Sequence, residues 1–391
     1  MDKFNAPSKV VFKKNVGVDT AKFLKDFNKV FILTSKTPKE NVIPMLSNFL
    51  NEEKIDFSVY TLSKKPFCDA ENILKISSLA KNADIILSVG AGSVCDTAKM
   101  ASKMLNIPYA VFPTTISHFG FFSNFAFVKN RFETTKEETN YPSKVFIDEN
   151  IISQSKENFI ISTLSFIFSF EEILISEFCK ESLFSKENMF YLNNLKKLIS
   201  RTEALANMID IKREIALLSL QENIIELFSI CNIICPDYTA IILANKLCEN
   251  SNSTFGRNTL ISSSVILECY KMFWNKQLEI KNIPNLEKYL KILEKNGKNL
   301  QFLIDFMNKT TKFKTNCFLN KIKTIKNKVT ERLNLEENKF KKNCEKLNNL
   351  FTQNETKVIV ENKIYDNLCY ISISQENFML NTLASFGYLN V

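Results

Sequence analysis

Two glycines stand two positions apart in the stretch Gly90-Ala91-Gly92-Ser93, in a chain of 391 residues that contains only seven glycines. They follow the apolar run 85–89, whose β-branched residues predict a buried strand. Apolar residues then recur at helical spacing as far as Asn106 and Pro108. Because glycine has no Cβ and tolerates positive φ, the N–H groups of such a turn can approach a phosphate closely. The positive end of the helix dipole points at the same turn, so the stretch predicts an anion site.

A second loop with suitable chemistry follows the next predicted strand, 109–112. It reads Pro113-Thr114-Thr115-Ile116-Ser117, and its hydroxyl groups suit a ribose or a phosphate. A purely structural glycine turn between a strand and a helix remains the alternative, because a lone G-x-G pattern is common there.

The longer combination of motifs resembles the nucleotide-binding half of a known superfamily. V-G-A-G-S-V-x-D-x-A-K, then I-P, then P-T-T-x-S-H-x-G-x-x-S is similar to the iron-containing alcohol dehydrogenases, glycerol dehydrogenases and dehydroquinate synthases. Ser117-His118 before Gly120 and Ser123 looks most like the sn-glycerol-1-phosphate dehydrogenases, which reduce dihydroxyacetone phosphate with NAD(P)H and use a zinc ion. The resemblance implies a set of candidate dinucleotide-binding residues: Gly90, Ala91, Gly92, Ser93, Val94, Asp96, Thr114, Thr115, Ser117 and Ser123.

The choice between NAD and NADP depends on the end of the predicted strand 29–34. An acidic side chain at such a position binds the ribose hydroxyls of NAD, whereas a basic or hydroxylic one accommodates the extra phosphate of NADP. Ser35 and Lys36 stand here and no acid does, which favours NADP over NAD, with a solvated turn lysine as the alternative. Lys99 has a similar choice, between contacting a phosphate and pairing with Asp96 along one helical turn.

The resemblance also implies a divalent metal, held by one Asp and two His, that acts as a Lewis acid on the substrate oxygen. The chain contains a single histidine, His118, which lies in the first half. The family positions for the metal ligands are occupied by Phe166, Ile241 and Phe255, so we expect the metal to be absent.

The substrate-contacting Asp of the resembling enzymes is replaced by Phe119, which leaves the substrate residue unidentified. His118 itself is a candidate proton donor or phosphate contact, or else a loop histidine bonded to backbone. Other side chains of the second half could rebuild a metal site in principle: Glu171, Glu172, Asp237, Glu249, Cys231, Cys235 and Cys248.

The length and the pattern predict two domains. Residues 1–152 alternate strands with helices, which predicts an α/β domain with a Rossmann-like parallel sheet. Residues 153–391 are nearly free of proline and glycine at first and show helical periodicity, which predicts an all-α domain. The resemblance implies a cleft between the two domains.

The net charge is +9, but the basic residues are dispersed among acidic ones over much of the chain. The densest basic stretch, 321–346, has the periodicity of an amphipathic helix. We therefore expect no nucleic-acid partner. The ten cysteines form no framework, and no apolar run of spanning length is evident, so a cytoplasmic protein without a membrane span is predicted. The resemblance implies a homo-oligomer.

Two hypotheses about function remain open from the sequence. The first is an NAD(P)-dependent oxidoreductase that acts on a small phosphorylated polyol or ketone, supported by the glycine turn. The second is a catalytically inactive homologue that retains nucleotide binding for a regulatory or structural role, supported by the missing histidines.

Overall fold

The computed structural model describes residues 9–63, 67–116, 120–130, 134–184, 189–234, 238–250, 255–275, 286–295, 297–310 and 316–348. The chain forms two compact units. The first comprises Met1–Thr163 with Arg201–Ile233, and the second comprises Leu164–Ser200 with Ile234–Val391. We predicted a single domain boundary at residue 152, and this stays a prediction. In the structure the first unit also includes Arg201–Ile233, a segment of the helical half.

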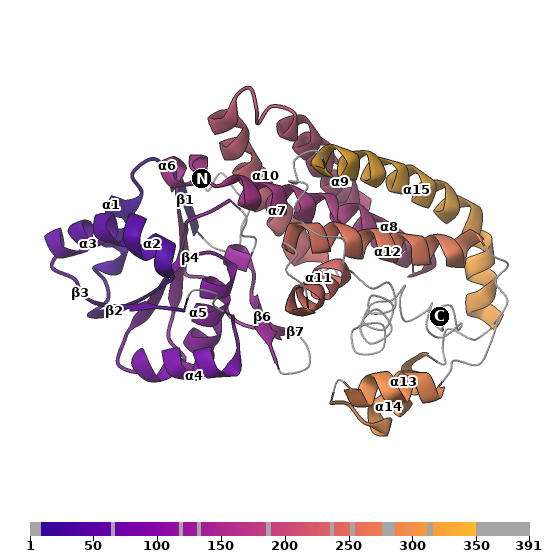
Figure 1. Ribbon diagram of the computed structural model, residues 1–391, viewed down its shortest axis with the longest axis horizontal. Coiled ribbons are helices and arrows are strands. Elements are labelled where there is room, and N and C mark those ends of the chain that lie inside the picture. The colour runs from indigo at the N-terminus through magenta and orange to yellow at the C-terminus, as the bar shows by residue number, and fades with distance from the viewer. Residues whose placement is uncertain are drawn as a thin grey trace. The chain divides into compact units, whose positions relative to one another are not determined.

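The first unit is built on a six-stranded parallel sheet (Figure 1). Its strands are β1 (Lys9–Lys13), β2 (Lys29–Thr34), β3 (Asp56–Thr61), β4 (Ile85–Gly90), β5 (Tyr109–Pro113) and β8 (Lys144–Asp148), in the spatial order β1-β8-β5-β4-β2-β3. Apart from β1 at the edge, this is a doubly wound order, in which β3 is added on one side of β2 and the later strands, from β4 on, are added on the other side. The point where the strand order reverses therefore lies between β2 and β4. The predicted α/β fold with a parallel sheet is confirmed.

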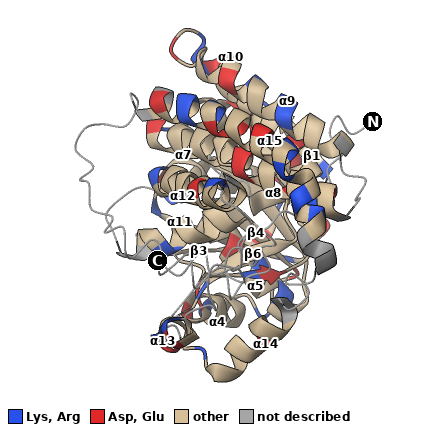
Figure 2. Ribbon diagram, turned by 90° about the vertical axis from the view of Figure 1, so that its right-hand side faces the viewer, with Lys and Arg blue, Asp and Glu red and all other residues tan. Residues whose placement is uncertain are grey.

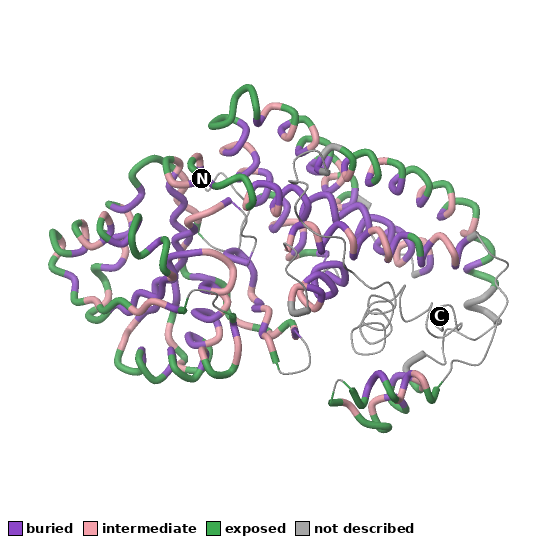
Figure 3. The backbone as a smooth tube through the Cα atoms, viewed as in Figure 1, coloured by how far each residue is buried: buried purple, intermediate pink, exposed green. Residues whose placement is uncertain are grey.

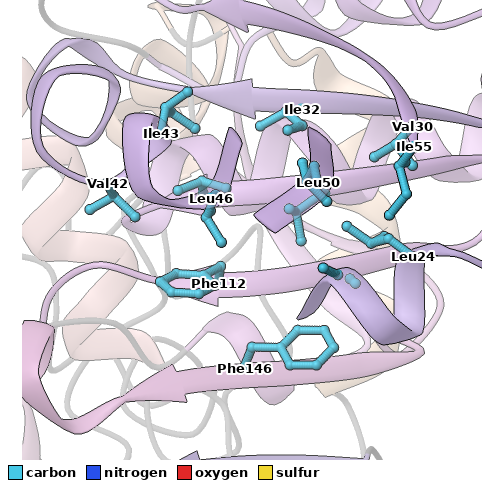
Figure 4. Close-up of a cluster of buried hydrophobic side chains, with 14 of the residues drawn as sticks. Leu24, Val30, Ile32, Val42, Ile43, Leu46, Leu50, Ile55, Phe112 and Phe146 are labelled. Atoms are coloured by element: carbon cyan, nitrogen blue, oxygen red, sulfur yellow. The ribbon is translucent and has the colours of Figure 1, made fainter. Parts of the chain in front are cut away.

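Helices cover both faces of the sheet, as right-handed crossovers require. The α1 (Gly17–Leu24) and α3 (Ile43–Glu52) helices pack together on one face, and the short α2 (Lys36–Asn41) leads from β2 into α3. The α4 (Ala70–Leu79) and α5 (Gly92–Leu105) helices also pack together, with α5 against β4. Figure 4 shows the buried cluster on the first face, where Leu46 and Leu50 of α3 meet Phe112 and Phe146 of the strands. Burial of these apolar side chains stabilises the sheet and fixes its carboxyl edge.

An antiparallel hairpin, β6 (Phe125–Lys129) and β7 (Thr134–Glu138), follows a short 3-10 helix, η1 (Gly120–Phe122). Both contact α5. The sequence analysis did not predict this hairpin, because its strands are short and the second, TTKEE, carries no apolar residue. Contacts to α5, described below, hold it in place.

The second half of the chain is helical, as predicted. Its helices are α6 (Glu149–Ser153), α7 (Glu157–Phe168), α8 (Phe170–Phe184), α9 (Met189–Ala206), α10 (Arg213–Ile234), α11 (Thr239–Asn250), α12 (Phe255–Asn275), α13 (Leu286–Lys295), α14 (Leu300–Thr310) and α15 (Asn316–Asn348). In Figure 3, α8 is buried along most of its length, whereas α15 alternates buried and exposed residues. The predicted strand 357–360 and terminal helix 375–389 lie outside the described residues.

The helical periodicity of residues 159–179 predicts one continuous helix. The structure divides this stretch at Ser169 into α7 and α8. The Ser169 hydroxyl donates to the carbonyl of Phe166 at 2.6 Å. A serine hydroxyl that binds the backbone of the preceding turn competes with the helical ladder and bends the helix.

By length and composition alone, two stretches of the described chain are long and apolar enough to cross a membrane: Glu157–Leu183 and Arg213–Ile234. Our expectation that no run reaches spanning length overlooked them. The most apolar windows of these stretches are 89% and 56% buried inside the protein, and a mostly buried apolar helix is typical of a protein core. They are therefore weak evidence for a span.

The basic stretch 321–346 lies within α15, as the periodicity predicted. Its buried residues, Ile322, Val329, Leu333 and Phe340, recur on one side of the helix. Figure 2 shows acidic residues among the basic ones of α15. One acidic residue, Glu336, is buried and pairs with Arg332 at 2.8 Å. The stretch is an amphipathic helix with a mixed charged face.

Candidate functional site at the carboxyl edge of the sheet

The ends of β2, β4 and β5 lie side by side at the carboxyl edge of the sheet. Thr34 pairs with Val89, and Gly90 pairs with Pro113. The Thr34 hydroxyl also donates to the Val89 carbonyl at 2.9 Å. In open parallel sheets, ligands bind outside the carboxyl ends of strands where the chain reverses direction, and here that point lies between β2 and β4.

The glycine turn stands at this point and opens directly into α5. Ala91 is the N-cap residue in extended conformation, and no side chain caps the helix. The first turn carries no acidic residue, and Ala91, Gly92 and Ser93 are half-buried. The first N–H groups of a helix have no acceptor within it, so this helix start can hold an anion such as a phosphate.

Gly90 is required by packing and not by its backbone angle. Among the described residues the only glycine with positive φ is Gly297, so the tolerance of glycine for positive φ is not used in this turn. A Cβ built on Gly90 would lie 3.0 Å from Cγ2, 3.1 Å from Cβ and 3.3 Å from Cγ1 of Val94. Val94 is itself 2% exposed, so the glycine lets the first turn of α5 pack closely on the end of β4.

The hydroxyl-rich loop after β5 lies beside the glycine turn. The Thr114 N–H donates to the Gly90 carbonyl at 3.2 Å, and Thr114 and Thr115 are half-buried. The Ile116 N–H donates to the Ser155 hydroxyl at 3.1 Å. The predicted residues Ser117, His118 and Phe119 lie outside the described residues.

Lys99 and Asp96 form a buried pair on α5. The Lys99 side chain is fully buried and the Asp96 side chain 13% exposed, and Lys99 Nζ lies 3.6 Å from Asp96 Oδ1. Asp96 also accepts the Phe127 N–H at 3.2 Å. Burial raises the pKa of Asp96 to about 6, against the lowering effect of the Lys99 charge. Of the two roles that we considered for Lys99, the pairing with Asp96 is the one observed.

Two further predicted residues serve within the protein. The buried Ser123 hydroxyl accepts from Lys99 at 2.8 Å and lies 3.0 Å from the carbonyls of both Gly120 and Phe125, to either of which it can donate. Val94 packs against Gly90. Apart from Asp96, the predicted dinucleotide-binding residues that are half-buried at this edge of the sheet are Ala91, Gly92, Ser93, Thr114 and Thr115.

Ser35 and Lys36 follow β2 on the other side of the glycine turn. Ser35 is the extended N-cap residue of α2, whose first turn holds no acidic residue. Ser35 is half-buried and Lys36 is exposed. This side of the site thus offers a hydroxyl and a cation, but no carboxylate from the end of the strand.

The described residues at the family's metal-ligand positions do not fit a divalent metal centre. Phe166 is 4% exposed and packs edge-on against Phe170, with ring centroids 5.0 Å apart, and Phe170 packs in the same way against Tyr238 at 6.4 Å. Ile241 is buried and Phe255 half-buried. Within the described ranges no group of three or more His, Cys, Asp or Glu side chains could hold an ion.

A cavity of about 330 Å³ lies elsewhere in the first unit, between β1 and α10. Its lining includes Phe12, Glu149, Leu218 and Glu222. It does not include any residue of the glycine turn, so it is separate from the candidate site.

Comparison with known proteins concerns the first unit above all. The sequence profile of the iron-containing alcohol dehydrogenases matches residues 11–155. A glycerol-1-phosphate dehydrogenase [NAD(P)+] of Methanosphaera stadtmanae is 35% identical over 140 residues, which are 36% of this chain and 39% of that protein. The enzyme of the same name from Methanobrevibacter smithii is 29% identical over 156 residues, 39% and 44% of the two chains. The chain thus matches about two fifths of the length of these relatives.

Solved structures match over nearly the whole chain. An archaeal halo-thermophilic alcohol dehydrogenase from a Red Sea brine pool superposes with a TM-score of 0.65 at 11% identity, over 99% of this chain and 93% of the other. The alcohol dehydrogenase from Oenococcus oeni gives a TM-score of 0.61 at 14% identity, over 99% of both chains. At these identities the likeness concerns the fold.

Proposed function

We propose, from the premise that this chain belongs to the superfamily of iron-containing alcohol dehydrogenases, that it is an NAD(P)-dependent oxidoreductase. The observation that carries the proposal is the uncapped start of α5 at the point where the sheet reverses direction. The similarity to glycerol-1-phosphate dehydrogenases over 140 and 156 residues supports it.

In this proposal the pyrophosphate of the dinucleotide binds the N–H groups at the start of α5, around Gly92 and Ser93. The hydroxyl groups of Thr114 and Thr115 bind the adjoining ribose or phosphate. Ser35 and Lys36 hold the 2′-phosphate of NADP, which we favour over NAD because no carboxylate repels that phosphate there. The bound reduced dinucleotide supplies a hydride to a carbonyl carbon.

The substrate that we propose is a small phosphorylated ketone or polyol of the dihydroxyacetone phosphate and glycerol 1-phosphate type. Its support is the activity named for the relatives, which match 36% and 39% of this chain. His118 is the candidate proton donor by resemblance. Assembly into a homo-oligomer and a cytoplasmic location stay predictions.

We further propose that the protein works without a resident divalent metal. The support is chemical, because the one histidine of the chain lies at position 118 and the candidate ligand positions carry aromatic or aliphatic side chains. The same observation favours a second candidate function, a homologue that binds the dinucleotide without catalysing hydride transfer. None of the compared proteins reported above is named as an inactive one.

One set of measurements on the purified protein tests these proposals. NADH and NADPH binding is followed by nucleotide fluorescence, and oxidation of each by absorbance with dihydroxyacetone phosphate, with and without added Zn²⁺ or a chelator. We expect binding of both nucleotides, tighter for NADPH, and oxidation that the chelator leaves unchanged.

The outcomes separate the candidates. Binding without oxidation under any metal condition selects the inactive homologue. Absence of binding, with no shift in melting temperature, rejects the whole proposal. A stoichiometric metal in elemental analysis, with activity lost on chelation, rejects the metal-free part alone.

A further inference from the structure

The ammonium group of Lys99 joins α5 to the chain that follows the hydroxyl-rich loop. Its Nζ donates to the Ser123 hydroxyl at 2.8 Å, to the Phe125 carbonyl at 2.7 Å and to the carbonyl of Gly120. An ammonium group has three hydrogens to donate, so all three are used. Lys99 is fully buried and donates to two backbone carbonyls and one hydroxyl. Its role is therefore to hold the backbone in place and not to present a charge at the surface.

Those partners sit at a defined place in the chain. The loop leaves β5 beside the glycine turn, where the Thr114 N–H binds the Gly90 carbonyl. The backbone is held again at Ile116, by Ser155. Farther along the chain, Lys99 binds the carbonyl of Gly120. Lys99, a side chain of the helix that begins at the glycine turn, thus fixes the backbone of residues 120–125.

A second contact of the same helix holds the hairpin. Asp96 accepts the Phe127 N–H, and its carboxylate faces Lys99. Other ionisable groups near Asp96 are the thiols of Cys68 and Cys95 and the phenol of Tyr109. Burial raises the pKa of each of these three groups above its usual value, so they are neutral near pH 7.

We propose that Lys99 is a positioning residue of the dinucleotide site, which acts by tying Gly120 and the β6–β7 hairpin to the helix whose N-terminus receives the pyrophosphate. The inference rests on the proposed function. Lys99 does not touch the dinucleotide, because its ammonium group is buried among Ser123 and the backbone carbonyls. Its loss removes the ammonium donor from those carbonyls and the cation from Asp96, so the chain after β5 loses one of its supports.

The test compares Lys99→Met with Lys103→Met. Methionine keeps the length and apolar character of the lysine stem but removes the charge. Lys103 lies on the same helix and also reaches the hairpin, at the Glu138 carbonyl 2.7 Å away, but its side chain is exposed. We expect Lys99→Met to weaken NAD⁺ binding at least tenfold in calorimetry, and Lys103→Met to change it less than twofold.

A pH series with NAD⁺ provides a measurement that a merely structural role would not move. NAD⁺ is the right probe because the 2′-phosphate of NADP⁺ is a phosphomonoester, which titrates near pH 6. The affinity of the wild-type protein should change around pH 6, where Asp96 titrates. In Lys99→Met this midpoint should move upward, because the cation that favours the ionised carboxylate is gone.

Equal NAD⁺ affinity of Lys99→Met and the wild-type protein would overturn the inference. If Lys99→Met does not fold, Ser123→Ala takes its place, since it removes one acceptor of the ammonium group; a threefold or greater weakening is expected, and unchanged affinity overturns the inference. A wild-type protein that binds neither NAD⁺ nor NADP⁺ rejects the proposed function itself.

Discussion

Substitution of Gly90 by alanine tests whether close packing of α5 on β4 builds the glycine turn. The new Cβ would lie 3.0 to 3.3 Å from three side-chain atoms of Val94, closer than ordinary van der Waals contact. Val94 is β-branched and stiff at χ1, so the start of α5 must shift to relieve the contact. Overpacking of this kind costs about 1–3 kcal/mol of unfolding free energy, and we expect Gly90→Ala to fall in this range.

Val94→Ala provides the matched second change. Alone it removes two buried methyl groups, at a cost of about 1.6 kcal/mol from area alone. In the double variant the methyl group added at position 90 occupies space that the valine methyls leave, so the two effects do not add. We expect the double variant to be more stable than the sum of the single effects by about 1 kcal/mol, within the range of contacting pairs.

The assay must follow the first unit. The only tryptophan, Trp274, lies in α12 of the second unit, so its fluorescence would report the wrong unfolding event. Hydrogen exchange by mass spectrometry of peptides from β4 and α5, measured against urea, reports the correct one. NADPH affinity is measured in parallel and should fall with Gly90→Ala and recover in part in the double variant. Additive free energies, within about 0.5 kcal/mol, would refute the packing argument.

Three further predictions follow from the described contacts. Because the pKa of Asp96 is raised to about 6 in the folded protein, its ionisation lowers the free energy of unfolding by about 2 kcal/mol between pH 4 and pH 6; Asp96→Asn should remove this pH dependence in urea titrations, and an unchanged slope would contradict the assignment. Tyr270→Phe removes the hydroxyl that binds the buried Glu172 at 2.6 Å and should cost about 1–3 kcal/mol, measured by Trp274 fluorescence, with an unchanged unfolding midpoint as the contrary result. Lys36→Glu should lower the preference for NADP⁺ over NAD⁺ at least tenfold in dissociation constants, whereas an equal ratio would exclude Lys36 from the phosphate site.

Periodicity and the glycine turn were sufficient to predict the framework of the molecule. The run 29–34 is β2 itself, because a short β-branched segment between turn signals can pack only as a buried strand. The helical half followed from the 3.6-residue repeat. What the sequence could not reveal were effects of distant contacts: β7 carries no apolar residue and is held by pairing with β6 and the contacts of the hairpin to α5.

The strand, glycine turn and helix of the candidate site could be predicted from the sequence. The contacts that explain its individual residues could not. The requirement for Gly90 comes from Val94, four residues later, and not from an unusual φ. Lys99 and Ser123 both looked able to meet a phosphate, yet they bind each other inside the protein. The partners of Lys99 lie 21 to 26 residues farther along the chain, so only the folded backbone reveals them.

The place of β1 bears on how the protein forms during translation. Lys9–Lys13 pairs only with Lys144–Asp148 within the described sheet, so β1 leaves the ribosome well before its partner β8 and waits for it. At roughly 5–20 residues per second, this delay is on the order of ten seconds. Strands β2 to β5 can assemble during that interval, and the nascent chain keeps its leading segment unpaired until β8 emerges.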